Sequence, residues 1–140
     1  MKILVAVDGS RYTKRMLAYL AAHDEWLGQA HDYTVLHAVP EIPGPAAAIL
    51  DKAALKAYYE AEAEKVLKTL RHFFERQKLR ADFVSKVGHP AEVIASVATK
   101  GRYELLLMGS HGRSAAANLL LGSVVSKVLG LTEVPVLVIR

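Results

Sequence analysis

The chain has 140 residues, which suits one hydrophobic core, and its 52% hydrophobic against 23% charged residues argue against a disordered chain. Its net charge of +4 comes from Lys and Arg scattered among Glu, and aromatic residues make up only 7%, so we expect no nucleic-acid partner. The absence of cysteine excludes disulfides, thiolate catalysis and cysteine-based zinc sites.

The N-terminal part of the chain predicts a strand followed by a helix. The apolar run at residues 3–7 has strand length and leads into Asp8-Gly9-Ser10. This run is too short for a signal peptide or a membrane span, so we expect a soluble, cytoplasmic protein with no membrane partner. Residues 13–27 then carry apolar side chains at three- and four-residue steps, which predicts a helix.

The rest of the chain repeats this alternation of strand and helix. Further apolar runs of strand length occupy residues 33–39, 83–87 and 105–108, with a last run that begins at Val134 and ends at Ile139. The Pro- and Gly-rich segment 40–45 is expected to be a loop, and residues 55–74 place their apolar side chains on one helical stripe. Because their spacing is helical, Trp26 and the Tyr58-Tyr59 pair are expected in the core.

Two later helices and the strand composition together predict the fold. The helices begin at His89-Pro90, since proline suits a first helical position, and at Gly122-Ser123. Strands that are apolar at nearly every position suit a parallel sheet covered by helices on both faces. We therefore predict that residues 1–140 form a single α/β domain: a three-layer, doubly wound, Rossmann-like fold whose five-stranded parallel sheet has the order 3-2-1-4-5.

Two glycine-bearing loops are expected to meet at the edge of this sheet. Ligands bind such folds beyond the carboxyl ends of the strands, where the winding direction reverses, which here lies between the first and fourth strands. Gly109 and Gly112 follow the fourth strand, and glycine permits positive φ and close approach of a ligand to backbone N–H groups. Gly122 and Ser123 stand at a helix start, where free N–H donors favour a phosphate.

The spacing Gly109-x2-Gly112-x9-Gly122-Ser123 resembles the nucleotide-binding pattern of the universal stress protein family, and the likeness extends over nearly the whole chain. This resemblance implies an adenine nucleotide alpha hydrolase-like fold, a stress-response role and an ATP site, and it allows Mg or Mn to accompany the ATP. Adenine would contact Asp8, and the other contacts implied are with Ala6, Val7 and Val39 for the base, Met108 and Gly109 for ribose and phosphate, and Gly112, Gly122, Ser123 and Val124 for the phosphates, with His111 and Arg113 beside them.

The chain departs from the family pattern at two places. Val125 and Ser126 stand where more polar residues often follow the glycine-serine pair, and residues 115–117 are all alanine, which bears on the order of the loop. A turn in which Ser10 caps the first helix also explains Asp8-Gly9-Ser10 without any ligand.

Three functions are compatible with these residues. We favour an ATP-binding regulatory or stress-response protein over a dedicated enzyme. A slow ATP hydrolase or phosphoryl-transfer enzyme using His111 or Asp8 stays open, although the sequence has no P-loop lysine motif and its six histidines lack metal-ligand spacing. A dimeric interaction module without nucleotide is the third.

The last strand predicts a homodimer. It is apolar and would lie at a sheet edge, where Pro135 is tolerated and unpaired backbone groups are available to another chain. The family also commonly pairs two subunits through its last strand, so the resemblance implies an isologous dimer through the strand from Val134 to Ile139. A monomer with a covered edge is the alternative.

Overall fold

The computed structural model describes residues 1–113 and 118–140. Five parallel strands form one sheet in the order β3-β2-β1-β4-β5, which confirms the predicted fold class and strand order. The strands are β1 (Lys2–Val7), β2 (Asp32–Val39), β3 (Ala81–Val87), β4 (Leu105–Gly109) and β5 (Val136–Ile139).

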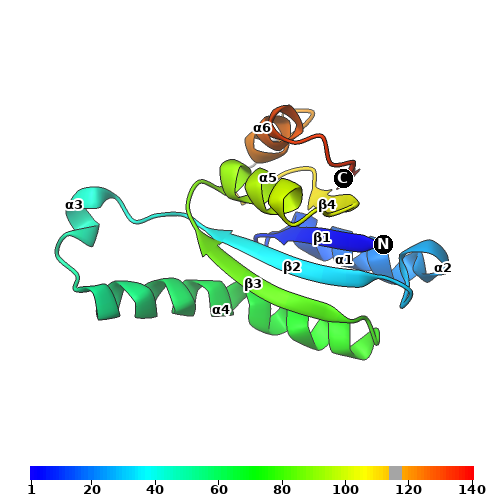
Figure 1. The fold of residues 1–140 in the computed structure, drawn as a ribbon, viewed down its shortest axis with the longest axis horizontal. Coiled ribbons are helices and arrows are strands. Elements are labelled where there is room, and N and C mark those ends of the chain that lie inside the picture. Colours follow the sequence, from blue (N-terminus) through cyan, green and yellow to red (C-terminus); the bar gives the residue numbers. More distant parts are fainter. Residues whose placement is uncertain (114–117) are drawn as a thin grey trace.

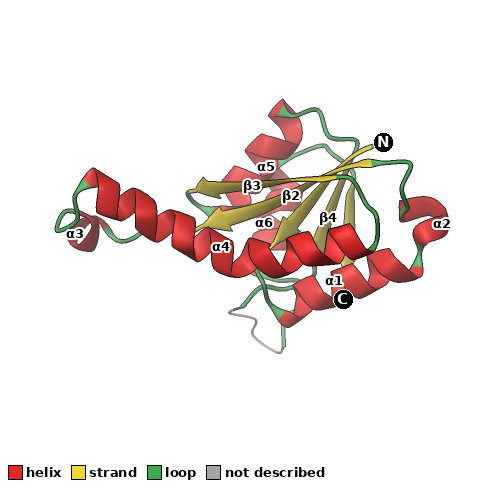
Figure 2. Ribbon diagram, turned by 90° about the horizontal axis from the view of Figure 1, so that it is seen from below, coloured by secondary structure: helices red, strands yellow, loops and turns green. Residues whose placement is uncertain are grey.

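Helices cover both faces of the sheet (Figure 1). One face packs against α1 (Arg11–Ala22), α2 (Asp24–Leu27) and α4 (Lys52–Arg76), and the other face packs against α5 (Pro90–Lys100) and α6 (Ser123–Leu131). The first part of α4 projects beyond the sheet, and the single turn α3 (Gly44–Ala47) lies beside its N-terminal end (Figure 2). Among the described residues, no helix combines the length and the apolar character that a membrane crossing requires.

Side chains of β1 alternate between two hydrophobic cores. Ile3 and Val5 pack with α1 and α4, whereas Leu4 and Ala6 pack with α5 and α6, and all four are buried. This two-sided burial explains why the strand is apolar at every inner position. Ala6 pairs with Met108 of β4, so the segments that leave both strands start side by side.

The helix predicted over residues 13–27 is two helices that break at His23. The ring of His23 bonds the Tyr19 carbonyl oxygen through Nδ1 (2.8 Å), and its backbone φ of −127° leaves the helical region. Trp26 is 40% exposed, so its predicted core position is wrong. It packs edge-on against Tyr19 at the surface instead, with the ring centroids 6.5 Å apart.

The predicted core position of Tyr58 is also wrong, because this part of α4 has no sheet beneath it. Tyr58 is 43% exposed, while Tyr59 is half-buried and its hydroxyl accepts a hydrogen bond from the Ile42 N–H (3.0 Å).

The last strand begins two residues later than predicted, at Val136, because the N–H of Val134 donates to Thr132 Oγ1 (3.2 Å).

Candidate functional site

The carboxyl ends of β1 and β4 border a cavity of about 360 Å³. Every residue that the sequence predicts for the site lines this cavity, namely Ala6, Val7, Asp8, Val39, Met108, Gly109, His111, Gly112, Arg113, Gly122, Ser123 and Val124. Residues 115–117 lie outside the described part of the chain, so the alanine-rich departure from the family pattern has no structural description.

The carboxylate of Asp8 is held by the start of α1. Its Oδ1 atom accepts hydrogen bonds from the Ser10 N–H (2.9 Å) and from the Thr13 hydroxyl (3.0 Å), while the Asp8 N–H donates to the same hydroxyl (3.2 Å). Ser10 is the N-cap of α1, and its hydroxyl accepts from the Tyr12 N–H (3.2 Å). The turn predicted as an alternative role is therefore present, and Oδ2 takes no part in it.

The three glycines of the motif are required by close packing rather than by backbone conformation. Positive φ occurs at Gly9 and Gly88 among the glycines of the described chain, so Gly109 and Gly112 do not use the positive φ that glycine permits. A Cβ on Gly109 would lie 2.7 Å from Tyr12 Cβ, and one on Gly122 would lie 3.0 Å from His111 Cα. At Gly112 a Cβ would lie 3.0 Å from Asp8 Oδ2.

Helix α6 begins at the cavity with its first turn uncapped. Gly122 is its N-cap, has no side chain to supply an acceptor, and donates its own N–H to the Ser110 carbonyl oxygen (2.7 Å). Within the described residues, no hydrogen bond uses the N–H groups of Ser123 and Val124, which both line the cavity. The positive end of the helix dipole and free N–H donors therefore border the cavity, an arrangement that suits an anion.

His111 fixes the loop and has no free ring nitrogen. Nδ1 is 2.9 Å from the Ser110 hydroxyl and Nε2 is 2.8 Å from the Leu119 carbonyl oxygen. The ring also lies against Tyr12, with the ring centroids 5.0 Å apart. With the Ser110 hydroxyl donating to Nδ1 and Nε2 donating to the carbonyl, both ring nitrogens are bonded to groups of the protein itself.

Sequence reasoning missed the part of the cavity wall that α4 supplies. Glu62, Lys65 and Val66 share one side of this helix by their three- and four-residue spacing, and all three line the cavity. The spacing was visible in the sequence, but the point at which α4 crosses the strand ends was not. The other missed lining residues are Thr13, His37, Ala38, Pro40, Pro90, Ile94, Leu119 and Val125.

The cavity wall is apolar in one part and rich in donors in another. Apolar surface comes from Ala38, Pro40, Ile94 and Met108. Donors come from the N–H groups at the start of α6 and from the ammonium group of Lys65. Such a wall suits a ligand with a flat apolar group and an anionic group. Within residues 1–113 and 118–140, no three His, Asp or Glu side chains gather as metal ligands would.

Comparison with known proteins identifies the family. The model described as the universal stress protein family matches residues 1–140. The universal stress protein in the QAH/OAS sulfhydrylase 3'region of Thermus aquaticus is 35% identical over 144 residues, covering 99% of this chain and 97% of that protein. The solved structure of MJ0577 from Methanocaldococcus jannaschii has a TM-score of 0.82 at 26% identity, covering 99% of this chain and 94% of that one.

Several solved structures of the same fold contain adenine nucleotides. The universal stress protein of Archaeoglobus fulgidus in complex with dAMP has a TM-score of 0.70 at 20% identity, covering 100% of this chain and 98% of that one. Two further neighbours of this fold contain cAMP or AMP, at 19% and 16% identity. On its match to the family model over its full length and its identity to the Thermus protein, this chain belongs to the universal stress protein family.

Proposed function

We propose that this chain is a nucleotide-binding regulatory protein of a stress response that holds ATP where β1 and β4 end. The observation that carries the proposal is the meeting of two distant loops: a Cβ on Gly112 would lie 3.0 Å from Asp8 Oδ2, beside the uncapped start of α6. One cavity thus combines a fixed carboxylate, apolar walls and free N–H donors.

Each part of the ligand has a complementary part of the wall. The adenine ring would lie among Ala6, Val39 and the apolar surface of β2, with Asp8 Oδ2 as the acceptor for a ligand donor. The phosphates would meet the N–H groups of Ser123 and Val124, where several donors act together on one anion. The adenine nucleotides in solved structures of this fold support the choice of base.

Binding without dedicated turnover fits the hydrogen bonding of the site. Hydrolysis needs a base with a free lone pair near the attacking water. Both nitrogens of His111 are bonded and Asp8 Oδ1 is held by α1, while Asp8 Oδ2 is the acceptor that the proposal gives to the base of the ligand. The described side chains gather no metal-ligand set, so Mg²⁺ or Mn²⁺ would be held chiefly by the phosphates.

We also propose that the chain forms a homodimer through β5. This strand lies at an edge of the sheet and carries the apolar, half-buried residues Val136, Leu137 and Val138. The opposite edge, β3, carries exposed charges at Asp82 and Lys86, which discourage pairing with another chain. Edge pairing of β5 with its copy about a twofold axis would satisfy its outward backbone groups.

Thermal melting of nucleotide-free protein with and without ATP tests the binding proposal. A ligand at about a hundredfold its Kd should add about 2.7 kcal/mol to the free energy of unfolding, and GTP at the same concentration serves as the comparison. Isothermal titration with ATP, ADP and AMP then gives the Kd values. An unchanged melting temperature with all three adenine nucleotides would contradict the proposal.

A further inference from the structure

Helix α4 carries a lysine to the rim of the cavity, and a neighbouring glutamate holds it there. Lys65 forms a hydrogen-bonded ion pair with Glu62, one turn earlier, and both residues line the cavity. The Lys65 side chain is 69% exposed and that of Glu62 is 30% exposed, so the ammonium group faces solvent at the cavity mouth.

Arg113 approaches the same place from the loop after β4. A Cβ on Gly9 would lie 3.0 Å from the Arg113 Nη2 atom and 3.4 Å from Val66 Cγ2, so the guanidinium group and the residue next to Lys65 both border Gly9. The hydrogen bond and the charge of Glu62 raise the pKa of Lys65, while desolvation and the charge of Arg113 act in the opposite direction. The two cations line the same cavity from different elements.

Two neighbouring cations at a cavity mouth point to an anionic ligand. Like charges repel, and among the described residues the acid that pairs with Lys65 is Glu62. The first-turn N–H groups of α6 are a separate set of donors in the same cavity. The two sets of donors belong to different elements of the cavity wall, and a chain of phosphates offers anionic oxygens to each of them.

We propose that Lys65 and Arg113 form a clamp for the outer phosphates and make the site prefer a nucleoside triphosphate to a monophosphate. This inference rests on the proposed nucleotide-binding function and assigns its specificity to α4. Glu62 competes with the phosphates for Lys65. Its carboxylate is bonded to the Lys65 ammonium group when the ligand is absent, and it repels the phosphates when the ligand binds.

Isothermal titration with AMP, ADP and ATP at one ionic strength tests the clamp with variants of α4. Lys65→Met keeps the length of the side chain but removes its charge, and it should weaken ATP about tenfold while changing AMP less than about twofold. Glu62→Gln should tighten ATP by about threefold, because it removes the competing charge.

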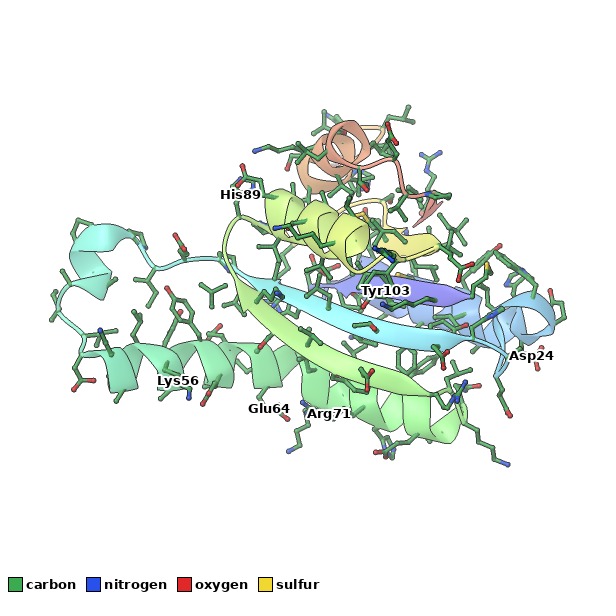
Figure 3. The ribbon with its side chains drawn as sticks, in the orientation of Figure 1. Asp24, Lys56, Glu64, Arg71, His89 and Tyr103 are labelled. Atoms are coloured by element: carbon green, nitrogen blue, oxygen red, sulfur yellow. The ribbon has the colours of Figure 1, made fainter. Side chains whose placement is uncertain are left out.

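The matched control is the ion pair of Lys56 and Glu60 on the same helix, 3.8 Å apart and exposed. Figure 3 shows Lys56 on the part of α4 that projects beyond the sheet, and neither residue lines the nucleotide cavity. Lys56→Met and Glu60→Gln should leave all three affinities unchanged. The affinity of the wild type for ATP should also fall more steeply with salt than that of Lys65→Met, a difference that a purely structural role would not produce.

The outcomes separate the clamp from the function on which it rests. If the wild type binds ATP but Lys65→Met keeps the same ratio of ATP to AMP affinity, the clamp is wrong and the proposed function stands. If Glu62→Gln binds ATP no more tightly than the wild type, its role as a competitor is wrong. If the wild type binds none of the three nucleotides, the proposed function and the clamp both fail.

Discussion

Gly112 lies against the carboxylate of Asp8, so the loop after β4 is in contact with the turn after β1. A Cβ at Gly112 would lie 3.0 Å from Asp8 Oδ2, closer than ordinary van der Waals contact. The other carboxylate oxygen accepts hydrogen bonds from Ser10 and Thr13, so Asp8 cannot easily turn away. The absence of a side chain at Gly112 therefore sets the width of the cavity at this point.

Gly112→Ala should weaken ATP binding about tenfold, because the added methyl group must displace either the carboxylate or the loop by a few tenths of an ångström. The cost in folding stability should stay below about 1 kcal/mol, since Gly112 is only half-buried and lies outside the two hydrophobic cores. Isothermal titration measures the affinity and urea denaturation the stability.

Gly130→Ala is the matched control for this substitution. Gly130 lies in α6, and a Cβ there would meet no atom within 4 Å. Replacing a helical glycine by alanine should stabilise the protein by about 0.5–1 kcal/mol and leave ATP binding unchanged. Equal ATP affinity in Gly112→Ala and the wild type would show that the contact with Asp8 does not shape the site.

Thr13→Val should reduce both stability and ATP affinity. Thr13 is 5% exposed, and its hydroxyl bonds both the N–H and the Oδ1 atom of Asp8, so valine leaves two polar groups without this partner. The expected loss is about 1–2 kcal/mol in the free energy of unfolding, measured by urea denaturation.

Thr13→Ser distinguishes the hydroxyl from the shape of the side chain. Serine keeps the oxygen that bonds Asp8 and lacks the methyl group, so it should retain most of the ATP affinity that valine loses. If the serine and valine variants bind ATP equally well, the hydrogen bonds of Thr13 do not position Asp8 for the ligand.

The strand order could be predicted from the sequence because local patterns and topology agree. The runs of β1 and β4 are apolar on both faces, strand and helix runs alternate along the chain, and right-handed crossovers then leave few arrangements. The meeting of the loops after β1 and β4 follows from that order, which is why residues as distant as Asp8 and Gly112 could be placed in one site.

What the sequence could not supply is the position of one element relative to another. The side chain of Lys65 has the same helical environment as other α4 lysines, and only the crossing of α4 over the strand ends brings it to the cavity. The position of α4 relative to the sheet also explains why Tyr58 was wrongly predicted in the core. The apolar stripe of α4 continues past the end of the sheet, where Tyr58 is exposed. Likewise, Gly109 is needed because Tyr12 packs against it from a separate helix, with the Tyr12 Cβ atom nearest.

Alkaline pH should destabilise the fold through Tyr33. This residue is 2% exposed, its hydroxyl donates to the Leu27 carbonyl oxygen, and burial raises its pKa from 10.0 to about 12. The unfolded chain therefore loses this proton at lower pH than the folded chain. Its contribution to stability is complete below pH 10 and is lost progressively as the pH rises toward about 12.

Tyr33→Phe isolates this effect from the titration of other groups. Near neutral pH the variant should be less stable by about 1–2 kcal/mol, because the Leu27 carbonyl oxygen loses its donor. The difference in unfolding free energy between the wild type and the variant should shrink between pH 10 and about 12. A difference that stays constant over this range would show that Tyr33 does not titrate differently in the folded chain.

The proposed β5 interface makes a prediction about single backbone N–H groups. Leu106 donates to the carbonyl oxygen of Pro135, just before β5, and Ser110 donates to that of Ile139, so both carbonyl groups point toward β4. Because neighbouring residues of a strand alternate, the N–H of Val138 points toward the open edge. Proline at this position removes an outward donor and leaves the ladder with β4 in place.

Val138→Pro should therefore sediment as a monomer in analytical ultracentrifugation, whereas the wild type should sediment as a dimer. Val138→Thr keeps both the β-branched shape and the N–H donor, so this control should remain dimeric. Thermal melting shows whether each variant is folded, which separates loss of pairing from loss of structure. A folded Val138→Pro dimer, or a monomeric wild type, would mean that two copies do not pair along this edge.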